Sequence, residues 1–163
     1  MQTISGKQYK ALAKCSEKRG KEWPAGKFSR PWYDPSFGGL IATNQFIIAA
    51  VYLDCGDAPA WCEADPARTL AGDTIVFDAP TDSAGRTALP VSTAMVKGVL
   101  MGFKAPARYA FDPSYIELLC KLAKAFDACI IHREGGRVGA FRLVRKTDEA
   151  EIGLAAVAPY KCR

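Results

Sequence analysis

Residues 5–21 read SGKQYKALAKCSEKRGK, and we expect them to form the first helix of the fold. Lysines recur along this stretch at steps of three, four, four and three residues, so a helix places them on one stripe. They are Lys7, Lys10, Lys14, Lys18 and Lys21. Ser5 is a suitable N-cap for a helix over residues 6–19, and Tyr9 and Leu12 form its apolar side.

The lysine stripe has two interpretations. Like charges three or four residues apart on a helix repel each other by about 0.2–0.5 kcal/mol per pair. A helix that tolerates this repulsion either faces water or meets an anionic partner. The stretch contains no acidic residue before Glu17, so nothing within its first turns neutralises the stripe.

The composition is that of a globular protein. The chain has 163 residues, of which 49% are apolar and 24% charged, which suits one domain with a hydrophobic core. The net charge of +5 permits nucleic-acid binding without requiring it, because the positive charge must be clustered to matter. We expect a cytoplasmic protein, since no apolar run is long enough for a transmembrane helix and the N-terminus lacks the apolar segment of a signal peptide.

The six cysteines indicate free thiols rather than a disulfide framework. No Cys-x-x-Cys pair occurs, and several of the cysteines lie inside apolar segments. We therefore expect buried, unpaired thiols, as is usual in a reducing compartment.

A second helix is predicted after residue 112. Asp112 is a suitable N-cap and Pro113 suits the first turn. Glu117, Lys121 and Lys124 lie on its polar side. The apolar side is made by Tyr115, Leu118, Leu119, Leu122 and Phe126. A short strand over residues 107–111 precedes this helix, and three strands are expected after it, over residues 128–133, 137–145 and 151–158.

The first half of the chain gives a less complete pattern. Residues 40–43 and 46–53 predict a hairpin whose turn is Asn44-Gln45. Two prolines make residues 27–33 an edge strand or a loop, and residues 73–78 predict a strand. We expect an irregular excursion over residues 54–72. Residues 91–105 have helical apolar spacing but contain two glycines, so helix and strand both stay open.

These elements predict an α+β fold in which a β-α-β-β-β unit occurs twice. The whole chain, residues 1–163, is expected to form one domain with halves of about 1–78 and 91–163. The two helices are expected to pack on one face of curved antiparallel sheets, so that both basic sides share one surface.

This pattern resembles a single domain of the DNA sliding clamps, the processivity factors of replication. Three stretches carry the resemblance: the basic helix of residues 7–21, the segment GLIATNQFII at 39–48, and YAFDPSYI at 109–116. The last two look like the clamp hairpin and the clamp helix start. The chain departs from the family in having Asn44-Gln45 where Asp-Gly is usual, and in being only one domain long, so a ring would need several copies.

The resemblance implies a non-catalytic, DNA-associated protein of replication or repair, and it fits a protein encoded by a phage or mobile element. The expected partner is duplex DNA, contacted at its phosphates without sequence preference, and a homo-oligomer is also expected. The expected nucleic-acid-binding residues are Lys7, Lys10, Lys14, Lys18, Lys21, Lys121 and Lys124. One alternative is a protein-binding module or inhibitor that blocks a host or replication protein.

No catalytic residue, metal site or cofactor is predicted. His132 is the sole histidine, and the spacing of Cys55 and Cys62 is not a standard zinc spacing. An enzyme that uses the acidic and cysteine residues of the central segment is a further alternative.

Aromatic side chains near the first helix suit either base stacking or core packing. They are Trp23, Phe28, Trp32, Tyr33 and Phe37.

Overall fold

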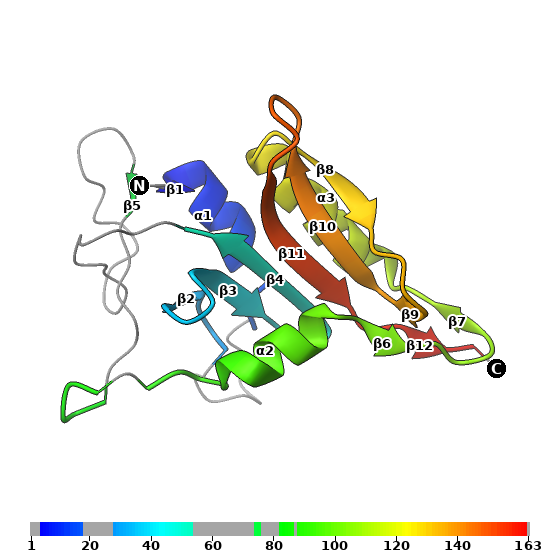
Figure 1. Cartoon of the computed structure of the whole chain (residues 1–163), viewed down its shortest axis with the longest axis horizontal. Helices are drawn as coiled ribbons and strands as arrows, with labels where there is room; N and C mark the ends of the chain where they lie inside the picture. The colour runs from blue at the N-terminus through cyan, green and yellow to red at the C-terminus, as the bar shows by residue number, and fades with distance from the viewer. Residues whose placement is uncertain (1–3, 18–27, 54–73, 76–81, 87, 163) are drawn as a thin grey trace.

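The computed structural model describes residues 4–17, 28–53, 74–75, 82–86 and 88–162 (Figure 1). The described part of the chain is an α+β fold with three helices and a six-stranded sheet. The α+β class expected from the sequence is therefore confirmed. The expected irregular excursion of residues 54–72 lies outside the described residues.

Three helices and twelve strands follow one another along the described residues. The helices are α1 (Gly6–Ala13), α2 (Thr93–Leu100) and α3 (Pro113–Ala125). The strands of the main sheet are β2 (Trp32–Asp34), β3 (Gly39–Thr43), β4 (Ile47–Tyr52), β8 (Ala128–His132), β10 (Ala140–Arg145) and β11 (Glu151–Val157). Shorter strands are β1 (Ile4–Ser5), β5 (Thr74–Ile75), β6 (Phe103–Lys104), β7 (Tyr109–Ala110), β9 (Arg137–Val138) and β12 (Tyr160–Lys161).

The main sheet has the strand order β2-β3-β4-β11-β10-β8, and the ladders that join its strands are antiparallel. Strands β4 and β11 meet at its centre, where Ala49 lies opposite Ala155. Three two-stranded pairs, β1–β5, β6–β9 and β7–β12, lie outside the main sheet.

The helix starts follow from local sequence. Ser5 and Gln8 form a capping box, in which each side chain accepts the backbone N–H of the other residue at 3.2 and 2.9 Å. In α3, the Asp112 carboxylate accepts the N–H of Ser114 at 2.8 Å, and Pro113 occupies the first turn. The predicted caps of both helices are confirmed.

The first helix is shorter than residues 6–19. After Ala13 the backbone tightens, because the N–H groups of Cys15 and Ser16 donate to carbonyls three residues earlier. Both Cys15 and Ser16 are buried in this tighter turn. Residues 18 and 19 lie outside the described residues.

The predicted hairpin is confirmed between β3 and β4. The Asn44 side-chain oxygen accepts the N–H groups of both Phe46 and Ile47 at 2.9 Å, and Gln45 has a positive φ of 75°. The Thr43 hydroxyl donates to the Ile47 carbonyl at 2.8 Å. Asparagine at this position therefore stabilises the turn with its own side chain.

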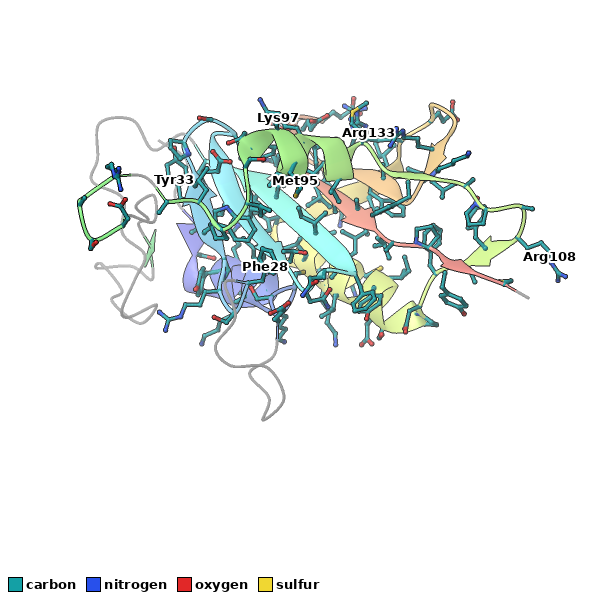
Figure 2. All side chains as sticks on the ribbon, turned by 90° about the horizontal axis from the view of Figure 1, so that it is seen from below. Phe28, Tyr33, Met95, Lys97, Arg108 and Arg133 are labelled. Atoms are coloured by element: carbon teal, nitrogen blue, oxygen red, sulfur yellow. The ribbon has the colours of Figure 1, made fainter. Side chains whose placement is uncertain are left out.

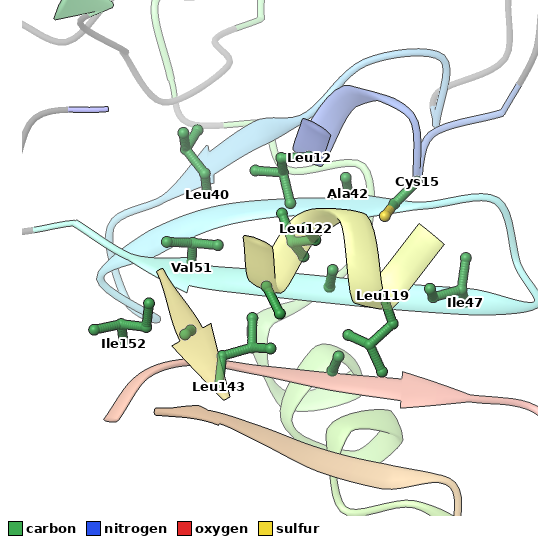
Figure 3. Packing of buried hydrophobic residues seen from close by; sticks show 14 of the residues in the cluster. Leu12, Cys15, Leu40, Ala42, Ile47, Val51, Leu119, Leu122, Leu143 and Ile152 are labelled. Atoms are coloured by element: carbon green, nitrogen blue, oxygen red, sulfur yellow. The ribbon is translucent and has the colours of Figure 1, made fainter. Parts of the chain in front are cut away.

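One face of the sheet is covered by α1 and α3. Leu12 and Cys15 of α1 and its following turn enter the same core cluster as Leu119 and Leu122 of α3 (Figure 3). The sheet contributes Leu40, Ala42, Ile47, Ala49, Val51, Leu143, Ala155 and Val157 to this cluster. The opposite face is covered by α2, which packs Val96 and Leu100 against a second cluster with Trp32, Ile41, Ile48, Ala50 and Ala156.

The structure corrects the expected layout of two similar halves. Helices α1 and α3 each precede three strands of the main sheet, but all six strands form one sheet, and the clamp-like pair of halves is not seen. Helix α2 on the second face has no counterpart in the other half among the described residues. Its presence has a physical reason, because Ile41 and Ile48 are apolar on that face and need cover.

Several element bounds also differ from expectation. Residues 91–105, left open between helix and strand, contain α2, which begins after Ser92 as its N-cap. The expected strand 137–145 is divided into β9 and β10 at Gly139, where φ is +76°. Where an edge strand or loop was expected over residues 27–33, the described residues from 28 onward form the strand β2 at residues 32–34. Thr74–Ile75 is the described part of the strand expected over 73–78.

Candidate functional site

Helices α1 and α3 lie next to each other on one face of the sheet (Figure 1). Tyr9 and Leu12 of α1 are buried in the same cluster as Leu119 and Leu122 of α3. Because each helix buries one side in this shared core, the other sides of both helices face away from the sheet together.

Exposed lysines occupy these outer sides. Lys7 and Lys10 on α1, Lys14 at its C-cap, and Lys121 and Lys124 on α3 are all exposed. The lysines of the two helices therefore cover the same side of the molecule, as the sequence predicted. Of the other predicted binding residues, Lys18 and Lys21 lie outside the described residues.

Most of this positive charge is unpaired. Lys121 forms an ion pair with Glu117 one turn earlier, with 2.7 Å between Nζ and Oε1. The hydrogen bond from Lys121 and its charge lower the pKa of Glu117. Within the described residues, Lys7, Lys10, Lys14 and Lys124 form no ion pair. We call these four residues together with Lys121 the lysine surface.

The aromatic side chains near α1 pack on the protein itself where they are described. Trp32 is 4% exposed and lies in the second core cluster, with its ring centroid 6.0 Å from that of Phe28. Phe37 stacks on Tyr52 at 5.4 Å. Trp23 lies outside the described residues. The core-packing interpretation therefore holds for Trp32, Phe28 and Phe37.

The cysteines are less buried than expected. Cys15 is buried, and burial raises the pKa of its thiol to about 12. Cys120 and Cys129 are exposed and Cys162 is half-buried, because the first two lie on the outer sides of α3 and β8. The expectation of buried thiols is wrong for these positions, while Cys55 and Cys62 lie outside the described residues.

The His132 side chain is exposed on β8 and packs edge-on against Phe141, with ring centroids 5.6 Å apart. Within the described residues, no three His, Cys, Asp or Glu side chains come together to form a metal-binding group.

A polar network that the sequence did not predict lies at one end of the central strands β4, β11 and β10. The Tyr52 hydroxyl donates to Glu151 at 3.0 Å, and Arg142 donates to the other carboxylate oxygen at 2.6 Å. Tyr52 and Glu151 are 99 residues apart in sequence, so only the pairing of β4 with β11 brings them together. Burial and the Glu151 carboxylate raise the pKa of Tyr52 to about 12.

This network predicts an alkaline loss of stability. An unfolded tyrosine has a pKa of about 10, so the raised value stabilises the fold fully below about pH 10 and is lost as the pH rises towards 12. Tyr52→Phe should flatten the fall in unfolding free energy across this window, measured by denaturant titration. Cys15 adds a loss of the same sign, which remains in the variant.

Tyr160→Phe is the matched control, because Tyr160 is exposed and lies outside the network. Tyrosinate absorbance should lose one component that titrates well above pH 10 in Tyr52→Phe and keep it in Tyr160→Phe. Equal alkaline behaviour of both variants would show that the network does not hold the Tyr52 proton.

An apolar cavity of about 260 Å³ lies between α2 and the β3–β4 hairpin. Met95, Val96 and Val99 of α2 line it together with Phe28 and Phe46. Phe46 at the hairpin turn also stacks on Tyr115 of α3 at 5.7 Å. Sequence reasoning missed this cavity because it depends on α2 covering the second face of the sheet.

No helix in the described part of the chain is both long enough and apolar enough to cross a membrane. Comparison of the chain with protein-family models, with curated proteins and with solved structures finds no match.

Proposed function

We propose that this protein binds the phosphate backbone of duplex nucleic acid through the lysine surface, without catalysis and without sequence preference. The observation that carries the proposal is the position of five exposed lysines from two adjacent helices on one side of the molecule. Sequence-independent binding needs clustered positive charge, because its free energy comes from phosphate contacts and released counterions.

The arrangement of charge supports this function over simple solvation. A helix that only faces water commonly mixes acidic and basic side chains, whereas α1 has no acidic residue among its eight. Helix α3 adds Lys124 and the partly neutralised Lys121. Replication or repair as the setting rests on the three sequence stretches quoted above and not on the fold, which lacks the two clamp-like halves.

Charge reversal on α1 tests the proposal. Lys7→Glu/Lys14→Glu should abolish most duplex binding at low salt, because it removes two phosphate contacts and adds two repulsive charges. Each phosphate contact contributes about −0.9 to the slope of log affinity against log salt concentration. Because the variant loses two contacts, its slope should be shallower than that of the unmodified protein by about 2. Fluorescence anisotropy with labelled duplexes of unrelated sequence measures both quantities.

Lys97→Glu/Lys104→Glu is the control, because it changes the net charge equally at exposed lysines outside the lysine surface. Lys97 lies on α2, which covers the opposite face of the sheet (Figure 2). The duplex affinity of the control should stay within about twofold of that of the unmodified protein, and its salt dependence should be unchanged. Equal losses in the two variants, or no binding by the unmodified protein at low salt, would contradict the proposal.

A protein-binding module is the second candidate, and one observation favours it. Phe46 and Met95 are 57% and 59% exposed beside the apolar cavity, and exposed large apolar side chains are common in protein interfaces. In that case Phe46→Ala/Met95→Ala would weaken binding to a replication protein while duplex affinity stays unchanged. Met95 lies on α2, on the face of the sheet opposite the lysine surface, whereas Phe46 also stacks on Tyr115 of α3, so Met95→Ala alone is the variant that separates the two candidates.

A further inference from the structure

Strand β8 forms one edge of the main sheet, with β10 as its neighbour among the described strands. The Arg133 N–H donates to the Ala140 carbonyl at 2.8 Å. Hydrogen-bonding residues alternate along an antiparallel strand, so Cys129 and Ile131 also direct their backbone groups to β10. Ala128, Ile130 and His132 therefore direct their N–H and C=O groups away from the sheet.

The two edges of the sheet differ in protection. At the β2 edge the strand has only three residues, Pro31 and Pro35 lie on either side of it, and Asp34 is buried within it. Short strands, prolines and inward charges are the usual devices that prevent an edge from pairing with another chain. Strand β8 has five residues and contains no proline, lysine or acidic residue.

The outer side chains of β8 are apolar. Ile131 is 42% exposed and Cys129 is also exposed, and both lie on the face opposite α3. On the α3 face, Ile130 is half-buried against the first core cluster. An uncharged strand with a free backbone edge and exposed apolar residues is a template for pairing.

We propose that β8 pairs with β8 of a second copy of this chain, antiparallel and around a two-fold axis. The strand is self-complementary in one register, in which Ile130 lies opposite Ile130 of the copy and Ala128 lies opposite His132. In this register all five residues pair, and the residues with free backbone groups become the hydrogen-bonded pairs.

Charges beyond the strand ends agree with this register. Asp127 lies opposite Arg133 of the second copy at both ends, which places opposite charges together. The Asp127 side chain is 67% exposed and pairs with Lys146 of its own chain at 3.4 Å, so Arg133 of the copy would join an existing ion pair. A shift of the register by two residues shortens the ladder and moves Arg133 opposite Cys129, or Asp127 opposite Ile131, so the matched charges are lost.

The dimer would contain a continuous sheet of two six-stranded sheets. A two-fold axis perpendicular to the sheet keeps each face on its own side, so α1 and α3 of both copies lie on the same face. The lysine surface would be doubled along one side, which would raise duplex affinity by adding contacts. The dimer itself rests on β8 and does not depend on the proposed function.

The solution mass of the full chain without nucleic acid tests the proposal. Analytical ultracentrifugation over a dilution series should give twice the monomer mass for the unmodified protein. Ile131→Lys should raise the dissociation constant at least about tenfold, because it places a charge against an apolar neighbour at each end of the ladder. Tyr160→Lys, which also adds one positive charge at an exposed site, on β12, should leave it unchanged.

A cysteine pair tests the register. Cys129 lies opposite Ile131 of the copy in a non-hydrogen-bonded pair, whose Cα atoms are about 4.5 Å apart and within disulfide range. Ile131→Cys should therefore give a cross-linked dimer on mild oxidation, and adding Cys129→Ser should abolish it. Lys97→Cys, at an exposed site on α2, should not cross-link.

Two results would overturn the proposal. One is a monomer at every concentration together with no cross-link in Ile131→Cys. The other is a dimer that withstands Ile131→Lys and whose Ile131→Cys form cross-links independently of Cys129. Because no nucleic acid is present, either result leaves the duplex-binding proposal to its own test.

Discussion

Leu122→Ala is expected to lower the free energy of unfolding by about 3–4 kcal/mol. Leu122 of α3 is fully buried, in the cluster where Leu12 of α1 and Leu143 of β10 also pack (Figure 3). Truncation loses the burial of the side chain and leaves a cavity where two helices and the sheet meet. The surrounding residues can relax into this cavity only slightly, because hydrogen bonds between the strands hold the sheet beneath it.

Denaturant titration followed by circular dichroism measures this change, and the slope with denaturant should stay constant if only native stability changes. Leu118→Ala on the same helix is the matched control, because Leu118 is only partly buried. It should cost about 1–2 kcal/mol, in proportion to the smaller apolar area it buries. Equal losses in the two variants would show that α3 does not dock on the sheet through Leu122.

Gly139→Ala is expected to destabilise the fold by about 3 kcal/mol or more, and to be among the most harmful small substitutions in the chain. Gly139 has φ of +76°, which disfavours any residue with a Cβ. A Cβ there would also overlap the Val157 carbonyl oxygen. That carbonyl cannot move freely, because the Val157 N–H donates to the Gly139 carbonyl at 2.8 Å.

Gly136→Ala separates the two causes. Gly136 has nearly the same φ, +77°, and no atom lies near the position of an added Cβ. Its substitution should cost only the conformational strain, about 1–2 kcal/mol. The difference in unfolding free energy between the two variants then measures the close approach of β11 to residue 139. If Gly139→Ala were no worse than Gly136→Ala, the described position of β11 beside Gly139 would be wrong.

The lysine stripe on α1 was predictable because its components are local. The lysines of residues 7–14 share a helix face through spacing alone, and the caps at Ser5 and Asp112 fix where the two helices begin. That α1 and α3 lie side by side was an expectation from a two-halves layout. The two helices do lie side by side. The two similar halves are not seen, because the strands that follow α1 and those that follow α3 form one sheet.

The remaining features could not be predicted from local patterns. The Tyr52–Glu151 contact, the apolar cavity and the free edge of β8 all depend on strand order. The order of the strands depends on which apolar faces bury each other, and these faces come from distant parts of the chain. Strands with similar alternating sequences can be placed in several orders, so their local patterns do not select one. The position of α2 on the second face depends on the same choice.

The sequence by itself therefore determined the helix starts, the Asn44 turn and the stripe of lysines on α1, since each depends on residues within about one helical turn of each other. The tertiary structure decided the pairing of β4 with β11, the two covered faces of the sheet and the position of β8 at an edge that no other described strand pairs with. These features depend on the burial of apolar surface between segments that are distant in sequence. No short stretch of sequence indicates the free energy of that burial.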